Sequence, residues 1–202
     1  KFKKKKEIFN KFLEADIREF SMLHYLSCKK KSLNTLRLID KYIEGIELEI
    51  DAVCDGDNIL IPGIMMHIEK AGVHSGDSVA VYPAKDLTEI EKNKITDQSE
   101  RIAKELQIKG LMNIQFILDR TSESKLYVIE VNPRSSRTIP FISKATGVPM
   151  VDLAVGAMNG EKLVNSKFGT GLLPERNIIA IKAPVFSMSK LTNVDTYLGP
   201  EM

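Results

Sequence analysis

The 202-residue chain has few cysteines, no long apolar run and little net charge. Cys28 and Cys54 have no metal-ligand spacing and are too few for a disulfide framework, which predicts a reducing, cytoplasmic location. No apolar stretch approaches the roughly 20 residues that span a bilayer. The basic start is not followed by the apolar core of a secretory signal. A net charge of +2 gives no general reason to expect binding to nucleic acid or to a membrane.

Several nucleotide-binding and hydrolase motifs are also missing. The chain has no Gly-x-x-x-x-Gly-Lys-Ser/Thr loop, no Gly-x-Gly-x-x-Gly and no Gly-x-Ser-x-Gly. These absences weigh against a P-loop ATPase, a Rossmann dinucleotide-binding protein and an α/β-hydrolase. His67 has no second histidine or cysteine at ligand spacing, so a zinc site is not expected either.

Residues 1–37 differ in character from the rest. They carry two lysine clusters and, between them, apolar residues at roughly helical spacing, which predicts a basic amphipathic helix. Its charged face is either simply solvated or an arm for an acidic partner or a membrane surface, and the first use is the commoner one. The chain begins with lysine, so we expect a fragment or a processed product. The apolar positions are Ile8, Phe9, Phe12, Leu13, Ile17 and Phe20.

Alternation and turn signals predict an antiparallel-rich α+β fold for the remainder, with one sizeable core. An Asp55-Gly56 turn predicts a hairpin between the first two strands. A capping box of Thr88 and Glu91 predicts the start of a long helix, and Gly110 is expected just past its end. The expected strands are 47–53, 58–64, 78–82, 111–118, 125–132 and 177–183, and the other expected helices are 137–145, which stops at Gly147, and one from Pro149, as first helical residue, to 159–160.

Carboxylate and amide side chains alternate along two of these strands. Glu130 and Asn132 share one strand face, with Arg134 just beyond, and Gln115 shares a face with Asn113. If the two strands pair, Gln115 lies near Glu130 and Asn132. Carboxylate and amide oxygens suit Mg²⁺ and a guanidinium suits phosphate, so the pattern points to metal–nucleotide chemistry. The alternative is that these residues line the solvent face of a half-buried sheet.

Side-chain direction gives two further expectations. Glu47 and Glu49 share a strand face, from which a carboxylate can accept hydrogen bonds from ribose hydroxyls. The alternative there is ordinary outward-facing polarity. Tyr127, Ile129 and Val131 are expected to share the other face of their strand.

The loop at 71–78 is a weaker candidate. Gly72 and Gly76 permit backbone bends that aim N–H groups at an anion, and His74 and Ser75 add polar side chains. The alternative is a plain connector with a surface histidine.

Five segments resemble the large subunit of carbamoyl-phosphate synthase, in order and in spacing. The longest is Gly-Ile-Met-Met-His-Ile-Glu-Lys-Ala-Gly-Val-His-Ser-Gly-Asp-Ser at 63–78. Its sequence is similar to that of the second, carbamate-phosphorylating ATP-grasp unit of that subunit. The match runs from about residue 38 to residue 202. The other four are Asp-Ala-Val-Cys-Asp-Gly at 51–56, Gly-Leu-Met-Asn-Ile-Gln-Phe at 110–116, Glu-Val-Asn-Pro-Arg at 130–134 and Ser-Lys-Ala-Thr-Gly-Val-Pro at 143–149.

The resemblance implies a C-terminal ATP-grasp lobe at 38–175, an antiparallel sheet flanked by helices. It would follow the basic helical segment 1–37 and precede residues 176–202, the start of a connection toward the regulatory domain. The implied activity is an ATP-dependent ligase that makes carbamoyl phosphate from bicarbonate, ammonia from glutamine, and ATP, with Mg²⁺ or Mn²⁺. The implied partners are the rest of the large subunit and a glutamine amidotransferase small subunit, in arginine or pyrimidine synthesis.

The resemblance also assigns roles to residues. Gln115, Glu130 and Asn132 would hold the metal, Glu130 and Asn132 acting in catalysis with Arg134, which would contact phosphate. Gln115 and Glu130 would also touch the nucleotide, whose ribose Glu47 would hold. The loop residues near the nucleotide and the phosphoryl acceptor would be Gly72, Val73, His74 and Ser75.

Residues 1–37 do not resemble the N-terminal ATP-grasp lobe with its glycine-rich phosphate loop. The isolated chain is therefore expected to have little or no activity. Two alternatives stay open: a non-catalytic nucleotide- or metal-binding module or degenerate fragment, and another ATP-grasp carboxylate ligase. The loop at 74–78 and the segment at 143–149 argue against the last.

Overall fold

The computed structural model describes residues 42–70, 73, 75–121 and 124–185. The chain divides into two compact units, Lys1–Ile43 and Glu44–Met202, and the features below all belong to the second. The helix predicted within residues 1–37 lies outside the described residues. The predicted boundaries after residues 37 and 175 stay predictions.

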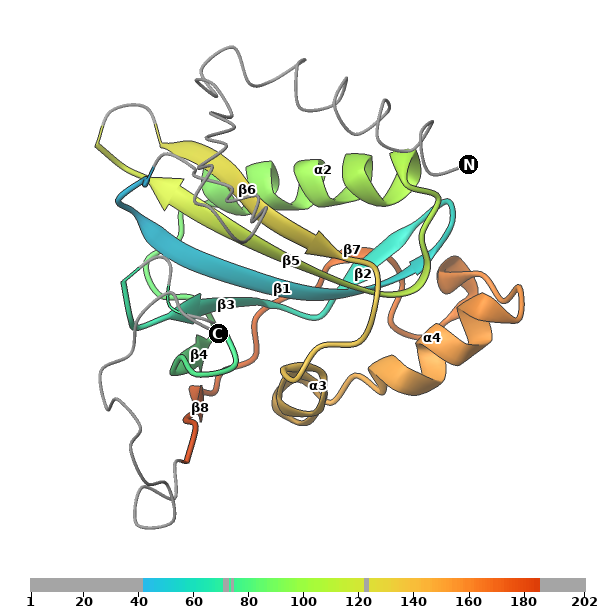
Figure 1. Cartoon of the computed structure of the whole chain (residues 1–202). Coiled ribbons are helices and arrows are strands. Elements are labelled where there is room, and N and C mark those ends of the chain that lie inside the picture. Colours follow the sequence, from blue (N-terminus) through green and yellow to red (C-terminus); the bar gives the residue numbers. More distant parts are fainter. Residues whose placement is uncertain (1–41, 71–72, 74, 122–123, 186–202) are drawn as a thin grey trace, which may run out of the picture. The chain divides into compact units, whose positions relative to one another are not determined.

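In the described part of the chain, one sheet of eight strands forms the centre of the second unit (Figure 1). Its main path runs β6-β5-β1-β3-β4-β8, with β2 against β1 and β7 against β2. The pairs are antiparallel apart from β2 with β7, so the predicted antiparallel α+β fold is confirmed. The strands are β1 (Ile46–Asp55), β2 (Ile59–Ile61), β3 (Ile64–His67), β4 (Ala80–Tyr82), β5 (Lys109–Asp119), β6 (Lys125–Asn132), β7 (Gly171–Leu172) and β8 (Ala180–Lys182).

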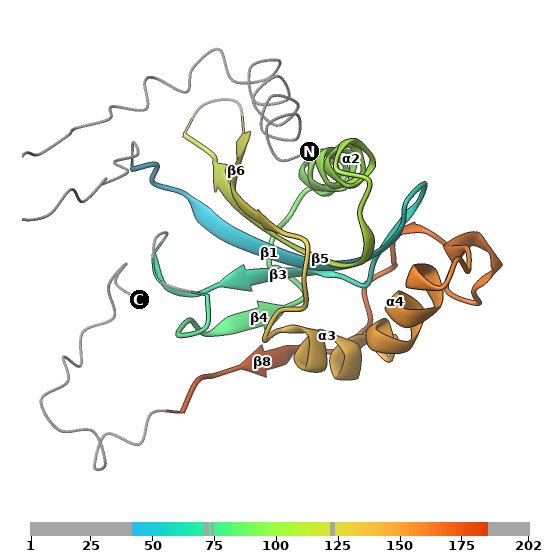
Figure 2. The ribbon, with the colours of Figure 1, turned by 45° about the vertical axis from the view of Figure 1, so that its right-hand side comes forward.

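Helices cover both faces of this sheet. Figure 2 shows α2 on one side and α3 and α4 on the other. The helices are α2 (Glu89–Glu105), α3 (Ile139–Thr146), α4 (Met150–Met158) and the short 3₁₀ turn η1 (Leu163–Asn165). Among the described residues, no single helix is long and apolar enough to cross a bilayer, and only the pair α3 and α4, bent by 111°, passes by length and composition together.

The predicted return strand of the first hairpin is interrupted at Pro62-Gly63. Both of its pieces, β2 and β3, pair with β1, so the hairpin itself is confirmed. Gly63 lies against the Tyr82 ring, where an added Cβ would come within 2.2 Å of Cε2. The missing side chain and the missing proline N–H together explain why the strand breaks there.

Helix α2 begins as predicted and ends earlier than predicted. Thr88 and Glu91 form the capping box, with a Glu91 N to Thr88 Oγ1 distance of 3.3 Å. The left-handed turn after the helix is made by Gln107, with φ of 51°, and not by Gly110. The chain must turn back at once to enter β5, and Gly110 instead lies within β5, where a Cβ would come 3.2 Å from Met158.

Removing the Glu91 carboxylate should destabilise the fold strongly. Glu91 is buried and accepts from Arg120 Nε at 2.8 Å and Nη2 at 2.7 Å, and these bonds lower the pKa of the Glu91 carboxyl to about 2. We expect Glu91→Ala to lower the free energy of unfolding in urea by about 2–4 kcal/mol, since the cap and a buried ion pair are both lost. The exposed Glu89→Ala in the same turn should cost about 0.5 kcal/mol or less. Equal losses in the two variants would contradict this role.

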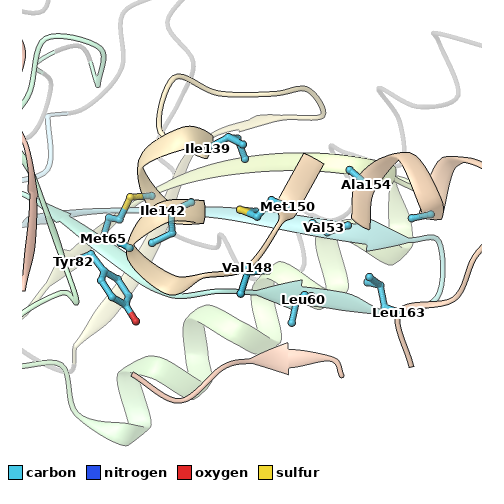
Figure 3. Close-up of a cluster of buried hydrophobic side chains, with 12 residues drawn as sticks. Val53, Leu60, Met65, Tyr82, Ile139, Ile142, Val148, Met150, Ala154 and Leu163 are labelled. Carbon is cyan, nitrogen blue, oxygen red and sulfur yellow. The ribbon is translucent and has the colours of Figure 1, made fainter. Parts of the chain in front are cut away.

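A cluster of buried hydrophobic side chains lies between the sheet and the pair α3 and α4 (Figure 3). Gly147, at φ 76°, closes α3 as predicted, whereas Pro149 is the N-cap of α4 and not its first helical residue. This packing fixes α3, and with it the segment that enters α3 from β6. The residues of this cluster are Val53, Leu60, Met65, Tyr82, Ile139, Ile142, Ala145, Val148, Met150, Ala154, Ala157 and Leu163.

Candidate functional site

The pairing of β5 with β6 brings the three predicted metal-site residues together. Gln115 lies opposite Glu130, and Asn113 lies opposite Asn132. The Asn132 amide nitrogen also lies 2.8 Å from Glu130 Oε1. The predicted proximity of Gln115 to Glu130 and Asn132 is therefore confirmed.

A β-bulge changes the faces of the rest of β6. Phe116 pairs with Val128, next to the Gln115 and Glu130 pair, so Ile129 is an extra residue with 46% of its surface exposed. The expectation that Tyr127 shares a face with Val131 is wrong, because one inserted residue reverses the alternation. Tyr127 instead lies opposite Ile117, on the Gln115 face.

A pocket of about 300 Å³ opens over this part of the sheet. It contains Glu130, Asn132 and Gln115 on one wall and two exposed arginines, Arg134 and Arg137, from the segment between β6 and α3. Its lining is mostly polar or charged, which suits a charged ligand. The lining residues are Glu49, Ser75, Gly76, Asn113, Gln115, Glu130, Asn132, Arg134, Ser136, Arg137 and Thr138.

The other sequence-predicted site residues fall into three groups. Ser75 lines the pocket, whereas the described residue Val73 and the buried Glu47 are not among its lining residues. Gly72 and His74 lie outside the described residues. Their assigned roles stay predictions.

Sequence reasoning missed several residues of this pocket. Arg137 follows Arg134 by three positions in a segment that is neither helix nor strand, so no periodicity placed it there. Asn113 was expected on the face of Gln115 but was not assigned to the site. The pairing of Asn113 with Asn132 in the structure shows that it belongs there. Ser136 and Thr138 gave no signal, because their role depends on a buried partner in β1.

Behind the pocket, the supposedly outward-facing carboxylates of β1 are buried. Glu47 and Glu49 are each 2% exposed, and His67 of β3 lies between them. Its Nδ1 is 3.1 Å from Glu47 Oε1 and its Nε2 is 2.9 Å from Glu49 Oε2. Burial opposes the charge of His67, but the two carboxylates outweigh it and raise its pKa to about 9. Outward polarity on this face is therefore excluded.

Asp51 ends this row of buried carboxylates and has no exposed surface. Burial and the nearby charge of Glu49 raise the Asp51 pKa to about 6. Burial also works against the charge of Glu49, but hydrogen bonds from His67, Asn113 and Thr138 prevail and lower the pKa of that carboxyl. Asn113 Nδ2 bridges the pair, at 2.7 Å from Glu49 Oε1 and 3.0 Å from Asp51 Oδ1.

The residues at the junction where β5 pairs with β6 fit a hard divalent cation that takes most of its coordinating oxygens from water and from a bound phosphate group. No three His, Cys, Asp or Glu side chains of the described residues form a metal cluster. The junction instead offers the exposed Glu130 carboxylate and the amides of Gln115 and Asn132. Mg²⁺ typically takes one or two carboxylates and completes its shell with water and phosphate oxygens, and the two arginines would attract those phosphates.

Comparison with known proteins gives one consistent family. Residues 17–166 match the family model described as carbamoyl-phosphate synthase L chain, ATP binding domain. The chain is 59% identical over 165 residues to the carbamoyl phosphate synthase large chain of Thermoanaerobacter sp. (strain X514), covering 82% of this chain and 15% of that one. It is 51% identical over 189 residues to the large chain of Lachnoclostridium phytofermentans, covering 94% and 17%. The chain therefore spans 15% to 17% of the length of these relatives.

Solved structures share the fold at low sequence identity. The biotin carboxylase of Campylobacter jejuni, in a β,γ-ATP complex, aligns with a TM-score of 0.57 and 18% identity, covering 72% of this chain and 31% of that one. The biotin carboxylase domain of Hydrogenobacter thermophilus 2-oxoglutarate carboxylase, with MgADP and bicarbonate, gives 0.55 and 24%, covering 71% and 30%. The described fold is thus that of an ATP-grasp lobe.

Proposed function

We propose, because the chain belongs to the carbamoyl-phosphate synthase large-chain ATP-binding family, that its pocket is the Mg–nucleotide half of a site that phosphorylates carbamate. The observation that carries the proposal is the convergence of Gln115, Glu130 and Asn132 with Arg134 and Arg137 in one pocket. Oxygen donors and guanidinium groups side by side are what a metal-bound polyphosphate requires.

In the proposed reaction, a carbamate oxygen bonds to the γ-phosphorus of ATP, and the bond from that phosphorus to the β–γ bridging oxygen breaks. Carbamoyl phosphate and ADP result. Glu130 would hold Mg²⁺, which when bound would supply positive charge against the charge that develops on the phosphates. Gln115 and Asn132 would orient the Glu130 carboxylate and complete the ligand set, while Arg134 and Arg137 would hold the transferred group in line. The chain needs no nucleophile of its own for this chemistry.

The finer assignments rest on family membership and on the sequence. We place the chain in the second ATP-grasp unit of a cytoplasmic large chain that works with the rest of that chain and a glutamine-hydrolysing small subunit. Bicarbonate, ammonia and ATP would be the overall substrates, in arginine or pyrimidine synthesis. Mg²⁺ is proposed as the cation, with Mn²⁺ as the alternative because it takes similar ligands.

The reverse half-reaction tests the proposal. Purified chain is mixed with MgADP and carbamoyl phosphate, ATP formation is followed, and MgADP binding is measured by calorimetry with and without EDTA. We expect Mg²⁺-dependent ADP binding and little or no ATP, because the chain spans only 15% to 17% of its relatives. Binding that ignores EDTA would contradict the metal–nucleotide site. The second candidate, a non-catalytic nucleotide-binding module, predicts the same result for the chain alone. The two are separated by adding the remainder of a related large chain that lacks this lobe: restored ATP formation would support the proposal, and none would favour the module.

A further inference from the structure

The segment 133–138, which carries both pocket arginines, is attached to β1 by two hydroxyl groups. Ser136 Oγ lies 2.6 Å from Asp51 Oδ1, and Thr138 Oγ1 lies 2.5 Å from Asp51 Oδ2. The same Thr138 oxygen is 3.1 Å from Glu49 Oε1. Each oxygen of the Asp51 carboxylate therefore has a partner in the arginine-bearing segment.

The side chains of this segment divide between two sides. Ser136 and Thr138 reach the buried carboxylates, whereas Arg134 and Arg137 are exposed in the pocket. A backbone hydrogen bond from Arg134 N to Asn132 O, at 2.8 Å, closes a tight turn directly at the end of β6. The two hydroxyls thus determine how the backbone runs between the metal-site strand and α3.

The Thr138 side chain makes these contacts and does not cap the helix that follows it. It is the N-cap of α3, yet its side chain makes no cap hydrogen bond to that helix. Threonine at this position usually accepts a bond from the first helical turn. Here the hydroxyl contacts the two β1 carboxylates, and Thr138 is only 2% exposed. Removal of this hydroxyl therefore removes the link to β1 without removing a helix cap.

We propose that Asp51 is a positioning residue: through Ser136 and Thr138 it fixes segment 133–138 and so holds Arg134 and Arg137 toward the bound phosphates. Asp51 suits this task because β1 pairs along its length with β5, so the anchor belongs to the most extensively paired part of the sheet. Prealigned cations bind a polyphosphate more tightly than cations that must first be ordered. The identity of the ligand rests on the proposed function, whereas the anchoring does not.

Thr138→Val is the first test, because it keeps the shape of the side chain and removes the hydroxyl. Amide hydrogen exchange over residues 133–142 and the Kd for MgADP are measured on the full chain. Losing one hydrogen bond to a carboxylate should speed exchange in this segment and weaken MgADP binding, each by about tenfold. Thr138→Ser should restore both. The matched control is Thr96→Val on α2, whose hydroxyl donates to the Lys92 carbonyl within its own helix, at 2.9 Å.

Asp51→Asn and Ser136→Ala extend the test from the hydroxyl to its partners. Asparagine keeps the size of the carboxylate but loses one acceptor, so it should reproduce the exchange pattern of Thr138→Val. If Asp51→Asn does not fold, Ser136→Ala with Thr138→Val supplies the same comparison. Parent-like exchange over 133–142 in both hydroxyl variants would overturn the proposal.

The two readouts separate this inference from the proposed function. If the parent chain binds no MgADP, the proposed function fails, but faster exchange in Thr138→Val would still support the anchor. If the parent binds MgADP and Thr138→Val shows faster exchange with an unchanged Kd, then the anchor does not position the arginines, and the proposal is overturned in its functional part.

Discussion

Replacing Glu130 with glutamine is expected to abolish Mg²⁺-dependent nucleotide binding and leave the fold intact. Two carboxylates line the pocket, and Glu49 is already engaged by His67 and Asn113, which leaves Glu130 as the exposed one. Glutamine keeps the size and one oxygen but loses the charge that a hard cation needs. Changing residues that only support a metal ligand costs about 10–100-fold in metal affinity. We therefore expect Glu130→Gln to raise the Kd for MgADP by about 100-fold or more.

The measurement is calorimetry of ADP binding with Mg²⁺ and with EDTA, alongside urea unfolding. Glu105→Gln provides a matched exposed glutamate on α2, on the opposite face of the sheet. It should leave MgADP binding and stability unchanged. Parent-like MgADP binding by Glu130→Gln would remove Glu130 from the metal site. A large loss of stability would show instead that the carboxylate is structural.

The parts of this site that follow from local sequence were predictable. Alternation along β5 and β6 placed Gln115 with Glu130 and Asn132, and the structure pairs them. The Thr88 and Glu91 capping box likewise needs only residues three apart. Such features depend on neighbours in the chain or on one strand pair, and the hydrophobic pattern sets the register of that pair.

The missed parts depend on contacts that no short segment contains. The bulge at Ile129 belongs to the pairing of β6 with β5, and it places Tyr127 on the face opposite to the expected one. Burial of Glu47 and Glu49 needs the strand order β5-β1-β3, which brings His67 between them, and the segment before α3, whose Thr138 hydroxyl contacts Glu49. Alternation tells which side chains share a face but not whether that face is covered. Outward polarity was therefore the natural but wrong expectation for β1.

The largest stability effect is expected for His67→Gln. His67 is 4% exposed and touches two buried carboxylates. Glutamine can keep a hydrogen bond to one of them, but Glu47 and Glu49 would then share a buried site without the imidazolium. Removing one partner of a buried ion pair costs about 3–5 kcal/mol, and we expect a loss of that size in urea unfolding at pH 6. The double variant His67→Gln with Glu49→Gln should recover part of it, since one uncompensated charge is gone.

The same residue predicts a pH dependence that tests its charge. The folded pKa of His67, about 9, lies above the ordinary 6.5, so its contribution to stability is complete below pH 6.5 and is lost as the pH rises through 9. A shift of this size corresponds to a loss on the order of 3 kcal/mol across that window. Asp51, with a raised pKa of about 6, affects stability mainly below the window, as the pH rises from 3.8 to 6. His67→Gln should flatten the profile between pH 6.5 and 9. A parent profile that is already flat there would contradict a charged His67 in the folded chain.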